Sequence, residues 1–485
     1  MSQIVNGKSV PFFHVLVPVL FLLVLITYGL ILQPRLFHKE AFPLEIVFLL
    51  AAFFSVAHLL CIGFKWNDIQ AAIVQKLSKG FPAILILFSI GLVIATWIIS
   101  GTIPMLIYYG IKLINPSYMY VLAFLIPVLF STLTGTSWGS AATIGTVIMG
   151  IASAVDAHLG ITAGAVIGGA YMGDKMSPLS DTTNLAALSV DVNLYEHIRS
   201  MMYTTASSAC IVVVVFFVLG YTHPPLLQDT NSPETLQMLT TLESMFDFNF
   251  LLLLPPLVVL MGSLRRMATL PTLLTSCALA CVLALGFQQF TFENVLTALK
   301  DGFHTHMTPW ATDIPERVGV LLNRGGLYAL NEVIIFTLMA LTFIGTLDVT
   351  QAMPRIVNRV FAFAKTRSAV ILSSLASTGF TNAITSNQPA TSFIIGDAFR
   401  KQYDRFKISR KVLSRSIEDY GTMLESLIPW SSTSLFMVAT LGVAHADYWH
   451  WQLLSLVNLV VAPVLAITGI GCFYHENNKG KNEKK

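Results

Sequence analysis

Two segments of this chain place a carboxylate, a proline and two hydroxyl side chains at the same spacing. They are D-K-M-S-P-L-S-D-T at 174–182 and E-S-L-I-P-W-S-S-T at 425–433, which begin 251 residues apart. Both lie in strongly apolar sequence, and a charged residue at the centre of a membrane helix costs roughly 2.5–3.5 kcal/mol on insertion scales. The repeated pattern therefore predicts a binding site for an ion or a small substrate, to which each copy contributes.

The proline gives each carboxylate residue a second ligand atom. Pro178 and Pro429 have no N–H for the carbonyl four residues earlier, so the carbonyls of Asp174 and Glu425 lose their helical partner. Leucines lie close to Glu425 on both sides, and burial disfavours the charged form of a carboxyl group. We therefore predict that Glu425 and Asp174 carry protons.

A structural interpretation of the first segment competes with this one. Asp174 and Lys175 would then flank a loop in water, and Asp181 would cap the helix that follows Pro178. Two carboxylates within a dozen residues of apolar sequence are better explained by ions or protons that neutralise them.

Two further polar strings repeat at the same offset. They are T-G-T-S-W-G-S at 134–140 and T-S-N-Q-P-A-T at 385–391. Hydroxyl and carbonyl oxygens in such a turn suit a dehydrated alkali cation. Small residues also permit close packing of helices, but packing alone has little use for Asn-Gln-Pro at membrane depth.

We predict that these four segments form one sodium or substrate site. The first half contributes Thr134, Gly135, Thr136, Ser137, Asp174, Ser177, Asp181, Thr182 and Asn184, and the second half contributes Thr385, Ser386, Asn387, Gln388, Ser431 and Thr433. The two halves differ at one position, because Ser432 stands where the first copy has Asp181. Direct cation binding is therefore expected in the first half and proton carriage by Glu425 in the second.

The composition is that of a membrane protein. Hydrophobic residues make up 54% of the chain, charged residues 11%, and the mean hydropathy is +0.70, whereas soluble chains carry about 25% charge. The lipid bilayer is thus a partner, and a net charge of +3 gives no reason to expect nucleic acid. No P-loop, G-x-S-x-G or H-E-x-x-H motif is present, so we expect neither an enzyme nor a cofactor.

Long apolar runs alternate with short, interrupted ones, which predicts an all-α polytopic membrane protein with re-entrant hairpins and broken helices. We expect 65–80 and 291–303 to lie on the membrane surface as amphipathic helices. The predicted parts are a first repeat at 1–220 (hairpin near 118–155, broken helix near 161–190), an acidic linker at 221–248, a second repeat at 249–471 (hairpin near 368–399, broken helix near 411–444) and a basic tail at 472–485.

Charge placement predicts that the two repeats have inverted topology. The loop 399–415 holds seven Lys or Arg residues and the tail is lysine-rich, so both are expected in the cytoplasm, whereas the linker has neither Lys nor Arg. The first repeat then begins in the cytoplasm and ends outside, and the second repeat begins outside and ends in the cytoplasm. Each repeat therefore crosses the membrane an odd number of times. Arg35 and Lys39 oppose this scheme, which places their loop outside.

The motifs resemble those of the NhaC-type sodium/proton antiporters. The resemblance rests on G-T-S-W-G-S-A-A-T-I-G-T at 135–146, G-D-K-M-S-P-L-S-D-T-T-N-L-A at 173–186 and E-S-L-I-P-W at 425–430, and it covers both halves. It implies membership of the ion transporter superfamily, whose homodimeric members contain two inverted repeats. It also implies a multi-pass protein of the bacterial inner (plasma) membrane, with both termini cytoplasmic by the charge pattern.

The resemblance implies a secondary active transporter that exchanges Na⁺ for H⁺ by alternating access. Na⁺ would be held by Thr134, Ser137, Asp174 and Asp181. The family also includes carriers of organic acids and amino acids. The alternative is therefore a Na⁺-coupled symporter or exchanger of a small organic acid, of the malate or lactate type, or of an amino acid. Such a carrier needs a cationic or amide group at its site, and Lys175, Asn184 and Asn387 are available.

Overall fold

The computed structural model describes residues 4–5, 8–225, 233–360 and 364–474. Apart from a short strand pair, β1 (Ile4–Val5) and β2 (Lys8–Ser9), and one isolated bridge, these residues form helices and their connections. Within them, seven helical segments are long and apolar enough to cross a membrane, or nine if each of two bent pairs is one span. The predicted all-α polytopic membrane fold is confirmed.

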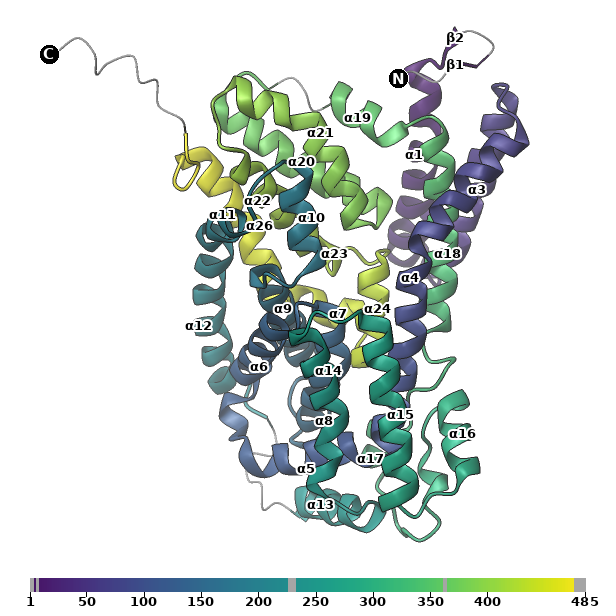
Figure 1. Cartoon of the computed structure of the whole chain (residues 1–485), viewed down its shortest axis with the longest axis vertical. Coiled ribbons are helices and arrows are strands. Elements are labelled where there is room, and N and C mark those ends of the chain that lie inside the picture. The colour runs from purple at the N-terminus through teal and green to yellow at the C-terminus, as the bar shows by residue number, and fades with distance from the viewer. Residues whose placement is uncertain (1–3, 6–7, 226–232, 361–363, 475–485) are drawn as a thin grey trace, which may run out of the picture.

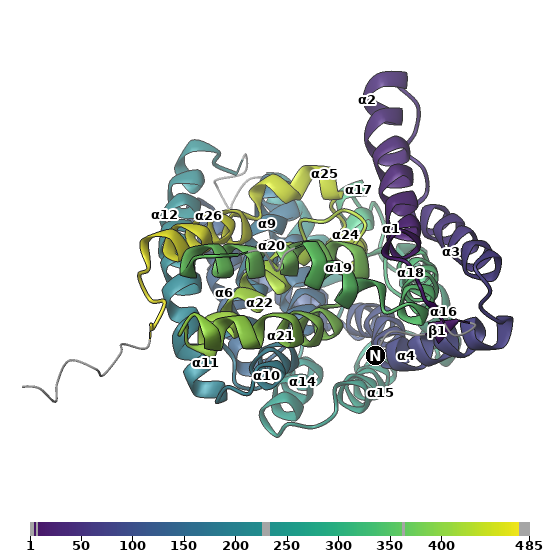
Figure 2. The same ribbon diagram turned by 90° about the horizontal axis from the view of Figure 1, so that it is seen from above.

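One group of helices stands at the side of the molecule (Figure 1). It consists of α1 (Phe12–Ile26), which continues through a π turn into α2 (Gln33–Phe37), α3 (Leu44–Cys61), α4 (Trp66–Ile99) and α18 (Asn331–Val349). α18 packs against both α3 and α4. Seen from above, α1 and α2 project away from the other helices (Figure 2).

The prediction of a separate surface helix at 65–80 is wrong. Residues 66–80 are the first part of α4, which runs for 34 residues without a break although it contains Pro82. The amphipathic pattern arises because this part of α4 packs against other helices on one side only. Ile69 is buried against Leu59 of α3 and Val349 of α18. The second such segment does form a short separate helix, α16 (Phe292–Asp301).

Further helices connect and support the four site segments. They are α5 (Thr102–Leu113), α11 (Leu194–Met201), α12 (Ser207–Thr222), α13 (Pro233–Met245), α14 (Leu254–Leu264), α15 (Thr269–Phe287), α17 (Glu316–Leu322), α19 (Ala352–Val360), α25 (His445–Tyr448) and α26 (Leu453–Thr468). α15 packs between α14 and α4, and α26 packs against α9 and α12. Part of the predicted linker, 226–232, and most of the predicted tail, 475–485, lie outside the described residues.

Each polar string lies at the turn of a helical hairpin or at a break in a helix. The first half contains α6 (Met119–Thr134), α7 (Ser137–Ser140), α8 (Thr146–Ala154), α9 (Leu159–Met176) and α10 (Asp181–Ser189). The second half contains α20 (Arg367–Thr385), α21 (Gln388–Arg405), α22 (Arg410–Tyr420), α23 (Thr422–Glu425) and α24 (Ser432–Leu441).

The two halves exchange contacts at these segments. α10 of the first half packs against α21 of the second, and α24 of the second packs against α8 and the π turn Ala141–Gly145 of the first. Both contacts involve a glycine, Gly396 beside Ser189 and Gly145 beside Leu441. The broken helix of each half therefore packs against the hairpin of the other half.

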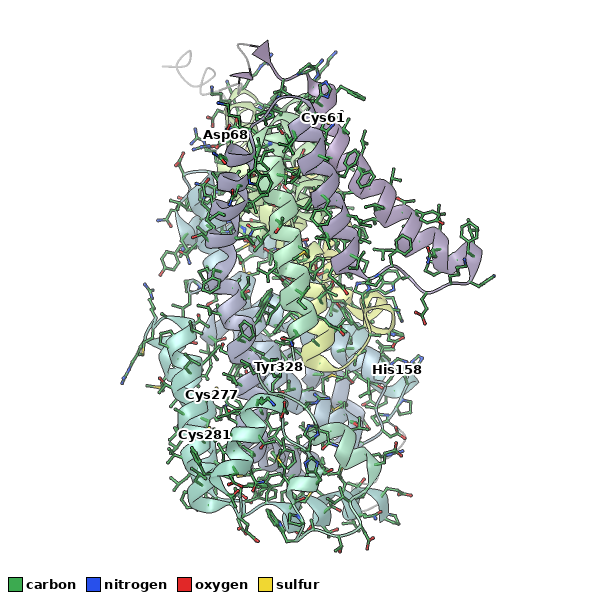
Figure 3. The ribbon with its side chains drawn as sticks, turned by 90° about the vertical axis from the view of Figure 1, so that its right-hand side faces the viewer. Cys61, Asp68, His158, Cys277, Cys281 and Tyr328 are labelled. Atoms are coloured by element: carbon green, nitrogen blue, oxygen red, sulfur yellow. The ribbon has the colours of Figure 1, made fainter. Side chains whose placement is uncertain are left out.

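The five cysteines form no disulfide. Cys277 and Cys281 lie one turn apart on α15, far from Cys61 on α3 (Figure 3). Cys277 is buried and Cys281 partly buried, as expected of packing positions. Cys61 and Cys210 are exposed on the surface of the protein.

Candidate functional site

The first hairpin turns at Gly135. This residue follows α6 with φ +69°, a left-handed conformation that glycine adopts at no steric cost. Thr136 then caps the next helix, because its Oγ1 accepts from the N–H of Gly139 at 3.2 Å. The hydroxyls of Thr134 and Ser140 bond across the turn at 3.2 Å.

The second hairpin repeats this geometry residue by residue at the offset of 251. Ser386 has φ +45°, and Asn387 caps α21 by accepting from the N–H of Ala390 at 2.8 Å. The hydroxyls of Thr385 and Thr391 bond across the turn at 3.1 Å. The sequence repeat is thus also a repeat of local structure.

The two broken helices correspond in the same way. After the breaks, Ser180 caps α10 and Ser431 caps α24, each accepting from the N–H three residues on. Each hairpin is tied to its own broken helix. Ser131 Oγ donates to the Ala170 carbonyl at 2.7 Å. At the equivalent place, Asn382 Nδ2 donates to the Gly421 carbonyl at 2.9 Å.

The carbonyls before the prolines are not free, and that expectation is wrong. The carbonyl of Asp174 accepts from the N–H of Ser177 at 3.0 Å. The carbonyl of Glu425 accepts from the hydroxyls of Ser431 and Ser434. The chain satisfies these groups locally because an unpaired buried carbonyl is costly. The carboxylates remain the candidate ligands.

A cavity of about 520 Å³ lies between the hairpin tips and the broken helices. Most of the predicted site residues line it, namely Thr134, Gly135, Thr136, Ser137, Asp174, Asp181, Thr182, Asn184, Ser386, Asn387, Gln388, Glu425 and Thr433. Three predicted residues do not, and each has a local partner instead. Ser177 donates to the Thr132 carbonyl, Thr385 bonds to Thr391, and Ser431 caps α24.

Asp174 is the most deeply buried acid of the cavity lining, at 3% exposure. Its Oδ2 accepts from the N–H of Ser137 at 3.1 Å, and its Oδ1 has no hydrogen-bond partner. The N–H belongs to the first residue of α7, at the tip of the hairpin. A buried carboxylate oxygen without a partner on a polar cavity wall is suited to a cation or a proton.

Glu425 faces the same cavity from the second half. Its Oε2 accepts from Thr433 Oγ1 at 3.0 Å and its Oε1 from Asn382 Nδ2 at 3.5 Å. Both of its oxygens thus have neutral donors from the protein, unlike Oδ1 of Asp174. The two acids therefore have different hydrogen-bond environments.

Asp181 and Asn184 lie at the exposed edge of the cavity. The helix after Pro178 is capped by Ser180, so Asp181 is not the cap of the structural interpretation. Asn184 donates its amide to the carbonyls of Pro178 and Ser180, which supports the break. Asp181 is thus a charge at the mouth, separate from the buried Asp174.

Several lining residues were not predicted from the sequence. Tyr171 and Thr422 come from the broken helices, Trp138 from the first hairpin, and Arg266 from the turn between α14 and α15. Trp138 stacks on Phe436 of α24 with 4.5 Å between ring centroids. The adjacent pair Arg265-Arg266 in a short apolar gap was the available signal for a cation at this site.

A buried ion pair lies behind the cavity. Lys175 bonds to Asp419 at 2.5 Å, and Arg415 lies 4.0 Å from the same carboxylate. Arg415 was counted among the cations of a cytoplasmic loop, but it is 2% exposed and donates to the carbonyls of Ser200 and Gly471. Within the described residues, no cluster of three or more His, Cys, Asp or Glu side chains is arranged for a metal ion.

A polytopic helical protein whose two hairpin tips and two broken helices surround one carboxylate-lined cavity has the architecture of a secondary transporter. The chain belongs to the Na⁺/H⁺ antiporter family, whose model matches residues 169–470.

The curated relatives cover nearly the whole chain. An uncharacterized Na⁺/H⁺ antiporter of Haemophilus influenzae is 38% identical over 94% of this chain and 95% of its own. The Na⁺/H⁺ antiporter NhaC of Alkalihalophilus pseudofirmus is 34% identical over 88% of this chain and 90% of its own. A malate-2H⁺/Na⁺-lactate antiporter of Bacillus subtilis is 30% identical over 91% of this chain and 93% of its own.

Proposed function

We propose that this protein exchanges Na⁺ for H⁺ across a bacterial inner membrane by alternating access. The observation that carries the proposal is Asp174, a buried acid of the cavity lining whose Oδ1 has no hydrogen-bond partner. A carboxylate can bind Na⁺ only after it has released its proton. One buried acid that accepts either cation but not both therefore couples the two fluxes in opposite directions.

The neighbouring groups support Na⁺ as the cargo. Besides Asp174, the cavity lining includes the hydroxyl residues Thr134 and Ser137 and, from the opposite hairpin, the amide residues Asn387 and Gln388. Carboxylate, hydroxyl and amide oxygens are hard ligands, which suit alkali cations. In this assignment Glu425, with its two neutral donors, is a second proton carrier.

The cavity is proposed to open to the cytoplasm. Its edge includes Arg266, which lies in the short loop that the positive-inside rule assigns to the cytoplasm. The exposed Asp181 also lines the cavity and attracts cations toward its mouth. Movement of the hairpins and broken helices against the surrounding helices would then expose Asp174 to the other side of the membrane. In this proposal the protein is a homodimer, as the family resemblance implies.

The test is Na⁺-driven proton flux in proteoliposomes that contain a pH-sensitive dye. Asp174→Asn should abolish the flux because the amide cannot exchange a proton for Na⁺. The matched control is Asp68→Asn, at an exposed acid near the start of α4 (Figure 3) that does not line the cavity. It should transport like the unmodified protein. Full Na⁺-dependent flux in Asp174→Asn would rule out the assignment.

The size of the cavity supports a second candidate, a Na⁺-coupled carrier of a small carboxylate or amino acid. Its volume of about 520 Å³ is many times the roughly 30 Å³ that one water molecule occupies in the liquid. Arg266 and the amide of Asn387 on its wall suit a carboxylate group. The relative named for malate and lactate exchange agrees with this candidate.

The two candidates differ in their need for an organic cargo. Uptake of labelled organic acids and amino acids should be measured in proteoliposomes with and without a Na⁺ gradient. Proton release on addition of Na⁺ alone supports simple exchange. Na⁺-dependent uptake of a labelled carboxylate that is lost in Arg266→Gln supports the second candidate.

A further inference from the structure

Glu418 is a buried acid that has no role in the Na⁺/H⁺ exchange proposed above. It lies on α22 at 0% exposure and does not line the cavity. Its Oε1 accepts from Gln388 Nε2 at 3.1 Å, and its Oε2 accepts from Thr422 Oγ1 at 2.7 Å. Both donors do line the cavity. Glu418 therefore stands directly behind two residues of the cavity wall.

The contact fixes which end of the Gln388 amide faces Glu418. An amide group has one oxygen that accepts and one NH₂ that donates. Since the NH₂ is bonded to Glu418, the oxygen is directed elsewhere, and Oε1 is buried without a hydrogen-bond partner. Gln388 is itself only 1% exposed. A buried acceptor without a partner is unusual, and Gln388 is a residue of the cavity lining.

Glu418 also orients the hydroxyl group of Thr422. Its hydroxyl proton is donated to Glu418, so its lone pairs are what it can offer to the cavity. One buried carboxylate thus turns two neutral side chains into oxygen donors.

The repeat supports a role for this contact. Gln388 is the first residue of α21, and the residue 251 positions earlier, Ser137, is the first residue of α7. Ser137 also bonds to an acid of the adjacent broken helix, through its N–H to Asp174. In the first half the acid itself faces the cavity, whereas in the second half the acid lies behind a glutamine that faces it.

We propose that Glu418 is a positioning residue that directs Gln388 Oε1 and the lone pairs of Thr422 into the cavity as ligands for the transported cation. This inference rests on the proposed function, because it requires that a cation enters the cavity. The second half then has its own cation ligands, which are the neutral oxygens of Gln388 and Thr422.

The test compares the KM for Na⁺ with kcat in proteoliposomes. Glu418→Gln keeps the shape of the side chain but allows the amide of Gln388 to reverse. We expect its KM for Na⁺ to rise about tenfold, the size of one lost contact between a charge and a dipole, with little change in kcat. Gln388→Leu should raise KM to the same extent, and adding Glu418→Gln to it should have no further effect.

The decisive variant combines Glu418→Gln with Gln388→Glu. The new amide at 418 can donate to one oxygen of the new carboxylate at 388 and still accept from Thr422. The other oxygen at 388 then faces the cavity, so the KM for Na⁺ should return to or below that of the unmodified protein. A role of Glu418 in packing alone would not predict this rescue.

The outcomes separate this inference from the proposed function. If the unmodified protein shows no Na⁺-driven proton flux, the proposed function fails. If it does, and Glu418→Gln has an unchanged KM or the combined variant is no better than Glu418→Gln, only the role of Glu418 fails. Should Glu418→Gln not fold, Gln388→Leu and Thr422→Val keep the acid in place, and an unchanged KM in both would overturn the role. Glu332→Gln, at an exposed acid on α18, is the control.

Discussion

Lys175 Nζ lies 2.5 Å from Asp419 Oδ1, and both side chains are fully buried. Lys175 directly follows the cavity acid Asp174 on α9, and Asp419 directly follows Glu418 on α22. The pair therefore joins the broken helix of the first half to that of the second, one residue away from an acid in each. Thr204 and Asn458 complete the contacts of the same carboxylate oxygen.

The two members of this pair should not be equally sensitive to substitution. Lys175→Met leaves Asp419 near Arg415 and bonded to Thr204, whereas Asp419→Asn removes the carboxylate that the two buried cations Lys175 and Arg415 share. Because removing one partner of a buried pair costs about 3–5 kcal/mol, Asp419→Asn should reach that range and Lys175→Met should cost less. Thermal unfolding of the purified protein in detergent measures both. Equal stabilities would contradict the asymmetry.

Substitution of Asp181 should impair transport less than substitution of Asp174, although both acids belong to the same sequence motif. Asp181 is exposed at the cavity mouth, and Asp174 is buried with an oxygen free. Asp181→Asn should therefore raise the KM for Na⁺ only a few-fold, as expected of a solvated charge worth about 1 kcal/mol or less, and this effect should shrink at high salt. Loss of all transport in Asp181→Asn would return it to the list of direct ligands.

Substitutions at the equivalent positions 135 and 386 of the two hairpin tips should have different effects on the stability of the protein. A Cβ on Gly135 would lie 2.6 Å from Leu179 Cβ, and its φ is +69°. Gly135→Ala should thus destabilise the protein by roughly 2–4 kcal/mol from strain and overpacking together. Ser386→Gly, at the equivalent position with φ +45°, relieves strain of about 1–2 kcal/mol but adds a similar entropy cost.

Thermal unfolding in detergent therefore distinguishes the tips. Gly135→Ala should lower the unfolding temperature clearly, and Ser386→Gly should change it little. A stable Gly135→Ala would mean that the first tip does not press on the break between α9 and α10.

The membrane orientation is testable by thiol labelling. After replacement of the exposed Cys61 and Cys210 by alanine, single cysteines are introduced as Lys401→Cys and Glu234→Cys, both at exposed positions. An impermeant maleimide added to intact cells should label the second and not the first, because the positive-inside rule puts the end of α21 in the cytoplasm and α13 outside. Labelling of Lys401→Cys alone would reverse the orientation, and labelling of both would place α13 and the end of α21 on the same side of the membrane, which contradicts the predicted orientation.

Features that depend on near neighbours in the chain were predictable from the sequence. The turns at 134–140 and 385–391 and the breaks at Pro178 and Pro429 follow from the local chemistry of glycine, proline and capping hydroxyls. The 251-residue offset predicted that these features occur twice, and the hydrogen bonds of Thr134, Thr385, Ser180 and Ser431 match that repeat. The inversion of the two halves stays a prediction.

Features that depend on distant neighbours were not predictable. The pattern at 65–80 fits a surface helix as well as one half-buried in a bundle, and only the packing of Ile69 between α3 and α18 decides between them. Periodicity reports which residues share a face, but it does not report what covers that face.

The sequence by itself determined the membrane class, the four polar segments and their duplication, because each rests on composition or on residues a few positions apart. The tertiary structure decided which carboxylates are buried and what they contact. It placed Asp174 on the cavity wall and Asp181 at its mouth, and it brought Lys175 to Asp419, 244 residues away. The environment of an ionisable group depends on chain segments that spacing cannot bring together, so its role appears only when the halves are assembled.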